Sequence, residues 1–339
     1  MLNAKDSARL GEDLAFSTKI LVDTTLALDD KVCREMAELK PDCIVADSMA
    51  IWGKAVARKL GIPFVSSTTT FAFNQYSAKV MKQGISDLIK MIFSMTKTTK
   101  QIKRLQNKGY PVKNILDIIG SDDSTHTIVY TSPEFQPYSE TFSDKYAFVE
   151  PSIRPAIEKI KKKKDKLIYI SMGTVNNDMM PFYKICLSAF TNTDYQAIMS
   201  VGNLVNLEDF EERPENISIF SHVDQIAVLQ QADIFVSHCG MNSVNESLYF
   251  GVPLIMLPQT SEQNGVCERV NQLGAGIKLD KADVPSILEA TNEIFMNTVY
   301  KQNAISISES FKRCSGAKGA VDKILQVCES SVLSEIDAH

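Results

Sequence analysis

The segment from Asp233 to Gln263 constrains the fold of this chain more than any other stretch. A short β-branched and aromatic run, Ile234 to Val236, follows a charged residue and predicts a buried strand. Gly251 and Pro253 end a helical stretch, and the apolar run Leu254 to Leu257 predicts the next buried strand. Strand, helix and strand in this order predict one parallel β-α-β unit.

The turn between the first of these strands and the helix carries polar residues. His238 and Gly240 follow the strand, and Asn242 and Ser243 open the helix. Backbone N–H groups and the positive end of the helix dipole meet there, and this combination attracts phosphate. Gly240 lets the backbone approach closely, and His238 offers an imidazole N–H beside a diphosphate. Glu246 lies one helical turn after Asn242 on the same face, where its carboxylate can accept both hydroxyls of a ribose.

A second polar pair, Glu262 and Gln263, is expected at the end of the next strand, within reach of further hydroxyl groups. The predicted order of bound parts is therefore ribose, diphosphate and second sugar. The alternative is an ordinary β-α-β unit whose polar residues only cap the helix. Capping explains Asn242, but it does not explain His238 and Glu246 together with this pair.

This segment resembles the nucleotide-sugar signature of the GT-B glycosyltransferases, specifically the UDP-glycosyltransferases of the macrolide glycosyltransferase type. The His-Cys-Gly spelling at residues 238–240 is shared with plant secondary-product enzymes. The resemblance covers nearly the whole chain and implies an α/β fold with two Rossmann-like, doubly wound domains that face a cleft. It implies an acceptor-side domain at residues 1–150 and a nucleotide-sugar-binding domain at 151–339, whose final helix is expected to pack back on the first domain.

The same resemblance implies an inverting, metal-independent hexosyltransferase that uses a UDP-sugar as its donor substrate and needs no cofactor. Gly173 and Thr174, in the turn after the predicted strand Leu167 to Ile170, match the family's Ser-x-Gly-Ser/Thr loop, which contacts the distal phosphate. The donor-binding residues that the resemblance implies are Gly173, Thr174, His222, Val223, Gln225, His238, Gly240, Asn242, Ser243, Glu246, Glu262 and Gln263.

Three positions depart from the family pattern. His222 stands where the family carries Trp or Phe against the uracil base, and Asp224 replaces the usual proline. Base affinity is therefore expected to be lower, and a surface histidine without a role remains an alternative for His222. Glu262 replaces the more common aspartate before Gln263, which leaves the identity of the hexose open.

The first half of the chain predicts a second β-α-β unit, with strands Cys43 to Ala46 and Pro63 to Ser67 around a helix Met49 to Leu60. By resemblance, Asp47 orients a catalytic histidine, and a hydroxyl from the run Thr68, Thr69 and Thr70 faces the donor sugar. From the residues alone, Asp47 with Ser48 is equally well interpreted as the N-cap of the helix, and the two roles are compatible.

Residues 78–108 show a helical pattern with one apolar stripe and a basic face. The simpler interpretation is a helix that faces the core with a solvated basic side. The resemblance instead puts the acceptor pocket here, where methionines and aromatic rings suit a small lipophilic acceptor and the lysines allow weak contact with an anionic membrane surface. The stripe consists of Met81, Ile85, Leu88, Ile92 and Met95, and the aromatic rings that suit the acceptor are Phe71, Phe73 and Phe93.

Family members open with a strand and a Gly-His-x-x-Pro type loop, whose histidine deprotonates the acceptor hydroxyl. The chain has four histidines, and none precedes Asp47. We therefore expect about 60 to 80 residues of the family's opening portion to be absent, at roughly thirty per β-α-β unit, and transfer to be impaired. The strand Cys43 to Ala46 would then leave an open sheet edge for self-association or a partner chain.

Two other functions remain open from the sequence. The chain is alternatively a non-catalytic UDP-sugar-binding chain whose partner supplies the missing strands and general base. A GT-B isomerase of nucleotide sugars is disfavoured because no acid/base pair is assigned.

Composition narrows the class further. The net charge of −5 gives no global basic field of the kind that nucleic-acid binding requires. No apolar run reaches the roughly eighteen residues of a membrane span, and the polar start is unlike a signal peptide, so a cytoplasmic chain is expected. The seven cysteines form no Cys-x-x-Cys pair and no metal-binding spacing, so they are expected to be reduced thiols rather than metal ligands.

Overall fold

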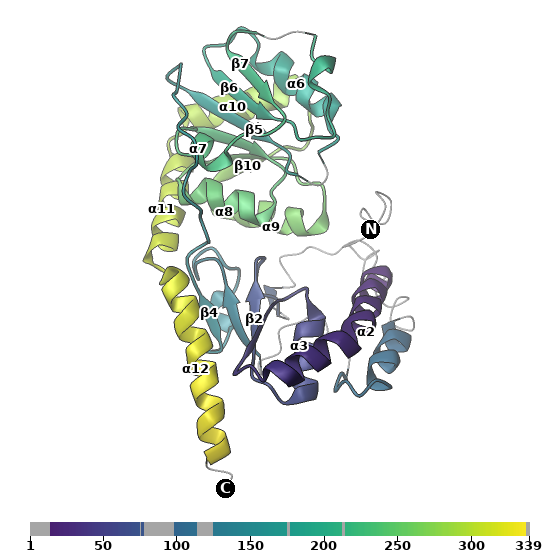
Figure 1. Cartoon of the computed structure of the whole chain (residues 1–339). Coiled ribbons are helices and arrows are strands. Elements are labelled where there is room, and N and C mark those ends of the chain that lie inside the picture. Colours follow the sequence, from purple (N-terminus) through teal and green to yellow (C-terminus); the bar gives the residue numbers. More distant parts are fainter. Residues whose placement is uncertain are drawn as a thin grey trace. The chain divides into compact units, whose positions relative to one another are not determined.

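The computed structural model describes residues 14–74, 76–77, 98–113, 125–174, 177–211 and 214–336. The chain divides into two compact units: residues Met1–Glu150 with Cys314–His339, and residues Pro151–Arg313. Each unit combines a parallel sheet with helices, so the chain has an α/β fold (Figure 1). Among the helices described, none is long and apolar enough to cross a membrane. The acceptor-pocket prediction for residues 78–97 falls outside the described residues.

Unit 1 is built on a four-stranded parallel sheet in the order β1-β2-β3-β4. Strands β1 and β2 are the two predicted from the sequence, with each end shifted by one residue. The helices α2 and α3 pack together, and residues 98–106 are also helical. The bounds are α2 Leu14–Leu39, β1 Ile44–Asp47, α3 Ile51–Leu60, β2 Phe64–Thr68, β3 His126–Val129, a 3₁₀ turn η2 Ser139–Thr141 and β4 Tyr146–Phe148.

The predicted start of the helix between the first two strands, at Met49, is wrong. Helix α3 begins at Ile51, and Ala50 at its N-cap position makes no side-chain capping bond. The chain first makes a turn, because Asp47 is still paired with Ser67 in the sheet and its carbonyl accepts the N–H of Ala50 at 2.8 Å. The Asp47 carboxylate instead accepts the N–H of Met49 at 2.8 Å, two residues before the helix.

The last helix, α12 (Gly316–Ile336), packs on the sheet of unit 1. Ala320 and Val327 from this helix share a buried cluster with Val65 and Ile128 from strands β2 and β3. The ammonium of Lys323 donates to the backbone oxygen of Asp144 at 2.9 Å. The core of unit 1 is therefore completed by residues from the end of the chain.

A buried carboxylate ties α2 to its neighbours in unit 1. Asp29 is only 2% exposed, and it accepts hydrogen bonds from Lys59 of α3 at 2.9 Å and from Cys33 at 3.2 Å. The Tyr110 hydroxyl donates to the same carboxylate. Burial acts to raise the pKa of Asp29, but the bonds from Tyr110, Lys59 and Cys33 outweigh it and lower that pKa.

Replacing this carboxylate should weaken unit 1. Asp29→Ala leaves the buried Tyr110 hydroxyl without its acceptor, so we expect a loss of about 1–3 kcal/mol in the free energy of unfolding by urea. Asp23→Ala, which removes a half-exposed carboxylate paired with Lys19 and Arg104, is the matched control and should lose at most about 1 kcal/mol. The difference between Asp29→Ala and the unmodified chain should shrink as the pH falls below about 4, because the lowered pKa stabilises only while the carboxylate is ionised. Equal losses in the two variants would contradict this account.

Unit 2 contains a six-stranded parallel sheet in the order β10-β9-β8-β5-β6-β7. The chain runs outward from β5 to β7, returns to β8 beside β5, and then runs outward on the other side to β10. The sheet therefore has its topological switch point between β5 and β8, where parallel α/β sheets bind their ligands. The strands are β5 Leu167–Ser171, β6 Gln196–Ser200, β7 Ile217–Phe220, β8 Ile234–Ser237, β9 Leu254–Met256 and β10 Gly276–Lys278. The helices are α6 Met180–Phe190, η3 Leu207–Asp209, α7 Gln225–Leu229, α8 Met241–Tyr249, α9 Ser261–Gln272, α10 Val284–Met296 and α11 Val299–Arg313.

The lysine run at residues 161–164 is bound to other parts of unit 2. Lys162 forms an ion pair with Asp233 at 2.6 Å, and the same carboxylate oxygen accepts the N–H of Leu167 at 2.7 Å. The backbone N–H of Lys163 donates to the side chain of Gln196 at 2.7 Å, and the ammonium of Lys164 donates to the backbone oxygen of Thr193 at 2.8 Å. The segment before β5 is therefore fastened to unit 2.

Candidate functional site

Two turns meet at the switch point of unit 2. Ser171 and Ser237, the last residues of β5 and β8, are paired in the parallel register. The turn that carries Gly173 and Thr174 follows the first strand, and the turn that carries His238 follows the second. Because the strands are parallel neighbours, both turns leave the same edge of the sheet. The two phosphate-contacting turns predicted from separate parts of the sequence are thus brought together.

The His238 imidazole is packed against two glycines. A Cβ atom placed on Gly173 would lie 2.6 Å from the Cε1 and Nε2 atoms of His238, and one on Gly240 would lie 2.7 Å from Nε2. Gly173 also has a positive φ of 83°, a conformation that favours glycine. Cys239, between His238 and Gly240, adopts a φ of 68°. Both glycines are therefore required by the position of the ring.

Burial lowers the pKa of His238 to about 4, and the backbone of Ser171 acts in the opposite direction. The ring is therefore neutral at neutral pH. Its buried Nδ1 atom has no hydrogen-bond partner among the residues that the structure describes. A neutral imidazole has one donor and one acceptor nitrogen, so His238 can contact a phosphate oxygen as a hydrogen-bond donor without carrying a charge.

Helix α8 starts directly after this turn. Gly240 occupies its N-cap position, and the first bond within the helix runs from the N–H of Val244 to the carbonyl of Gly240 at 3.0 Å. The N–H groups of Met241, Asn242 and Ser243 precede that bond, so the helix itself does not use them. The Asn242 side chain is exposed and that of Ser243 is half-buried. The start of α8 thus offers donors and a positive dipole end beside His238.

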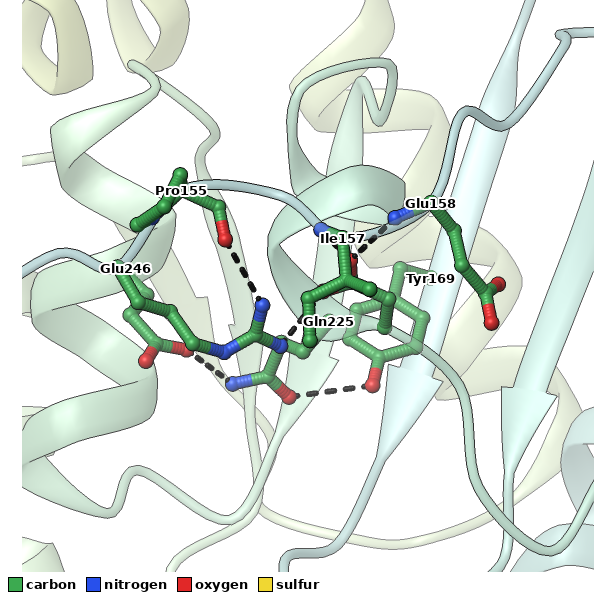
Figure 2. Close-up of polar contacts among 8 residues, drawn as sticks. Pro155, Ile157, Glu158, Tyr169, Gln225 and Glu246 are labelled. Atoms are coloured by element: carbon green, nitrogen blue, oxygen red, sulfur yellow. Dashed lines mark hydrogen bonds and ion pairs between the residues drawn. The ribbon is translucent and has the colours of Figure 1, made fainter.

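Glu246 lies on α8 within a hydrogen-bonded row of side chains (Figure 2). The Gln225 amide donates to Glu246 Oε2 at 2.5 Å, and its nitrogen also lies 3.4 Å from the Ser243 hydroxyl. The Tyr169 hydroxyl donates to the amide oxygen of Gln225 at 3.1 Å. Burial raises the pKa of Glu246, against the hydrogen bond from Gln225 and the charge of Arg154. The structure therefore joins three predicted donor-binding residues, Gln225, Ser243 and Glu246, through their side chains.

Asp224, where the family pattern has proline, anchors the segment that enters unit 2. Its buried carboxylate binds the Arg154 guanidinium at 2.6 Å, and it accepts the N–H groups of Ile157 at 2.6 Å and Glu158 at 3.0 Å. Burial alone would raise the pKa of Asp224, but Arg154 and the backbone donors hold it well below its usual range. Residues 154–158 are thereby placed directly beside Gln225.

The remaining predicted donor residues lie at the borders of these turns. Thr174 and His222 are exposed, and Val223 is half-buried in the turn between β7 and α7. Their side chains are not joined to the Glu246 row by any bond that the described part of the chain shows. Among the described residues, no group of three or more His, Cys, Asp or Glu is arranged to hold a metal.

The predicted placement of Glu262 and Gln263 at the end of a strand is wrong. Strand β9 ends at Met256, and both residues lie in the first turn of helix α9. The helix starts there because the Thr260 side chain caps it, accepting the N–H of Gln263 at 3.3 Å. The amide oxygen of Gln263 accepts the N–H of Gln259 at 2.8 Å in return. Glu262 is exposed at this helix start.

Asp47 and the threonine run belong to unit 1. Asp47 ends β1 and is exposed, while Thr68 ends the neighbouring strand β2 and is buried. Thr69 is exposed, and the Thr70 hydroxyl contacts the backbone oxygen of Phe71 at 3.4 Å. Because β1 and β2 are parallel neighbours, Asp47 and these threonines lie at the same edge of the sheet of unit 1.

Comparison with known proteins identifies the family. Residues 165–313 match the family described as UDP-glucoronosyl and UDP-glucosyl transferase. The NDP-glycosyltransferase YjiC of Bacillus licheniformis is 35% identical over 295 residues, which is 84% of this chain and 72% of that protein. The chain belongs to the UDP-glycosyltransferase family. Demethyllactenocin mycarosyltransferase of Streptomyces fradiae is 26% identical over 76% of this UDP-glycosyltransferase and 56% of its own length, in line with the macrolide type.

Solved structures agree on the fold of this UDP-glycosyltransferase. The glycosyltransferase of kitacinnamycin superposes with a TM-score of 0.82 at 22% identity, covering 92% of this chain and 82% of that one. The likeness confirms the GT-B fold class, with two α/β units, that the sequence resemblance implies.

Sequence reasoning missed several residues that shape the site of the UDP-glycosyltransferase. Tyr169 lies in a run that indicates only an apolar strand, and no sequence pattern singles out Arg154. Asn177 donates to the Gly173 carbonyl at 3.2 Å, and it fits only because Gly202 has no Cβ, which would lie 1.9 Å from the Asn177 amide nitrogen. The polar hydroxyl of Tyr169 in a buried strand was the one available signal, because such a group needs a partner.

The packing of His238 against Gly173 can be tested without any ligand. In Gly173→Ala the new methyl group must displace the ring toward solvent, so the midpoint of the His238 titration followed by NMR should rise from about 4 toward its ordinary value near 6.5. Gly109→Ala is the matched control, because Gly109 has a φ of 84° and nothing within 4 Å of its would-be Cβ. That variant carries the same backbone strain and should leave the midpoint unchanged. An unshifted midpoint in Gly173→Ala would refute the proposed packing.

Proposed function

We propose that this UDP-glycosyltransferase transfers a hexose from a UDP-sugar to a hydroxyl group of a small lipophilic acceptor, with inversion at the anomeric carbon and without a metal ion. The observation that carries the proposal is the meeting of the β5 and β8 turns, with the His238 ring held between Gly173 and Gly240 at the start of α8. Such a site suits a diphosphate, because it presents neutral and backbone donors together with a helix dipole.

In this proposal the donor lies along unit 2 in a fixed order. The diphosphate binds at Gly173, Thr174, His238 and the start of α8, and the ribose diol binds at Glu246. The base lies beside His222, Val223 and Gln225, while the hexose reaches Glu262 and Gln263. Support for the ribose step is the half-buried carboxylate of Glu246, whose two oxygens both act as acceptors, without a competing O–H, only while it is ionised.

The proposed transfer is a direct displacement. The acceptor hydroxyl oxygen forms a bond to the anomeric carbon from the side opposite the diphosphate, and the bond from that carbon to the terminal phosphate oxygen breaks. UDP leaves with the bonding electron pair, and its new negative charge is stabilised by the donors around His238. The acceptor proton passes to a general base, and Asp47 has the role of orienting that base if it is an imidazole.

A lipophilic acceptor is favoured by the aromatic residues that follow the threonine run. Phe71 packs its ring against that of the buried Phe135, with centroids 5.4 Å apart. Phe71 follows Thr70 directly in the sequence, so this pair of rings places apolar surface next to the hydroxyl groups that are proposed to face the sugar.

The ribose assignment predicts a difference between two ligands. Glu246→Gln keeps the size of the side chain but can accept from only one hydroxyl, so it should weaken the binding of UDP by about tenfold and that of deoxyuridine diphosphate by much less. Isothermal calorimetry on both ligands measures this. Asp233→Asn, a change in a carboxylate on the linker side of unit 2, should leave the ratio of the two affinities unaltered. Equal losses for UDP and its deoxy form in Glu246→Gln would place Glu246 outside the ribose site.

Transfer itself should be slow in the purified chain and insensitive to chelators. Asp47 by itself is a poor base for an alcohol, and a well-placed base contributes about 10²–10⁴-fold in rate. We expect UDP binding by residues 1–339 with weak transfer to hydrophobic alcohols, and unchanged transfer when EDTA is added. An added chain that supplies a Gly-His-x-x-Pro loop should raise the rate, and Asp47→Ala should then lower it while leaving UDP affinity within about twofold.

The same assay decides the alternative function. Among the described strands of unit 1, β1 lies at an edge of the sheet, and Val45 on it is 44% exposed, which favours pairing with a further strand. A binding chain that depends on a partner would show UDP affinity and no measurable transfer alone. Robust transfer by the chain alone would instead show that another residue acts as the base.

A further inference from the structure

The proposed ribose contact depends on a tyrosine that lies behind it in the sheet. Tyr169 is in the middle of β5 and is 1% exposed. Its ring stacks on that of Phe235 in the neighbouring strand β8, with centroids 4.8 Å apart and an interplanar angle of 15°. The ring is therefore held rigidly by the two strands that form the switch point, and its hydroxyl group has a fixed position.

That hydroxyl group determines which way the Gln225 amide points. The Glu246 carboxylate is an acceptor only, so the amide must turn its nitrogen toward Oε2, at 2.5 Å. The amide oxygen then faces Tyr169, whose hydroxyl donates to it at 3.1 Å. In the reversed orientation the amide oxygen would face the carboxylate and repel it. A donor at position 169 and an acceptor at position 246 thus select the same orientation (Figure 2).

We propose that Tyr169 is a positioning residue of the nucleoside site, whose hydroxyl orients the Gln225 amide so that this amide holds the Glu246 carboxylate ready for the ribose diol. The inference rests on the proposed function, because the diol is the ligand of Glu246 there. Tyr169 touches neither ribose nor phosphate in this arrangement and acts only through Gln225.

The charges around Glu246 explain why an oriented amide matters. Arg154 attracts the carboxylate and Asp224 repels it, and these two residues are bound to each other at 2.6 Å. Burial raises the pKa of Glu246, and the Gln225 bond acts against this rise. When the amide is no longer held, that pKa should rise further, and the carboxylate should lose its charge at a higher pH.

The test is Tyr169→Phe, which keeps the stacked ring and removes only the hydroxyl. We expect it to weaken UDP binding by about three- to tenfold, the effect of one neutral hydrogen bond, and the binding of deoxyuridine diphosphate by less than about twofold. Tyr195→Phe is the matched control. Tyr195 precedes β6, stacks on Phe295 with centroids 5.2 Å apart and donates to the Asn292 amide oxygen at 3.1 Å. The substitution therefore removes the same kind of hydrogen bond from a stacked tyrosine just before the start of β6, whereas the candidate site lies after the carboxyl ends of β5 and β8. It should alter neither affinity.

Two further measurements separate positioning from general loosening of the fold. In a Gln225→Ala background, Tyr169→Phe should have no additional effect on UDP affinity, because the residue that transmits its influence is gone. The pH at which UDP affinity falls on acidification should be higher in Tyr169→Phe than in the unmodified chain, because Glu246 must be ionised to accept the diol.

The outcomes distinguish the inference from the function on which it rests. Absence of UDP binding by the unmodified chain would overturn the proposed function. Normal UDP binding that Glu246→Gln weakens but Tyr169→Phe leaves unchanged would overturn the inference alone. Equal weakening of UDP and its deoxy form by Tyr169→Phe, or undiminished weakening in the Gln225→Ala background, would also overturn it.

Discussion

The pairing of β5 with β8 is the constraint on which the site depends. Ser171 and Ser237 end their strands in register. The connection after β5 leads to β6 on one side of the pair, and the connection after β8 leads to β9 on the other side. Only at such a point do two turns open beside each other without a helix between them. His238 then fills the space above Gly173, and the first turn of α8 adds its N–H groups. The pairing of β5 with β8 therefore brings Gly173, the His238 imidazole and the start of α8 together.

Three carboxylates, the buried Asp29 and Asp224 and the half-buried Glu246, differ in how far their partners offset the cost of burial. Asp29 and Asp224 have lowered pKa values because cations and several donors overcome the cost of burial. Glu246 has a raised pKa because its partners do not overcome that cost. The first two are satisfied by the protein itself and hold elements together. In the third, burial still outweighs the hydrogen bond from Gln225, and under the proposed function its remaining acceptor capacity serves the ribose.

Strand positions and the main polar residues could be predicted from the sequence because they depend on local patterns. Short apolar runs predicted strands β1, β2, β5, β8 and β9 to within one residue at each end. The starts of helices were harder to predict where a side chain bonds a nearby backbone N–H group. Asp47 accepts the N–H of Met49 before helix α3 begins, and Thr260 caps helix α9, which places Glu262 and Gln263 in a helix rather than at a strand end. Contacts between distant segments, such as Arg154 with Asp224 or Tyr169 with Gln225, left no local signal because neither partner has an unusual neighbour in sequence.

The division of the chain gives the two units different histories during synthesis. Unit 2 is one continuous stretch, Pro151–Arg313, whereas unit 1 needs Ala320 and Val327 from α12 to close the cluster around Val65. On the ribosome, every residue of unit 2 emerges before the helix α12 that unit 1 requires. The cluster around Val65 therefore stays incomplete until α12 has been made. Under the proposed function, a bound UDP-sugar would stabilise unit 2 during that interval, before the core of unit 1 is complete.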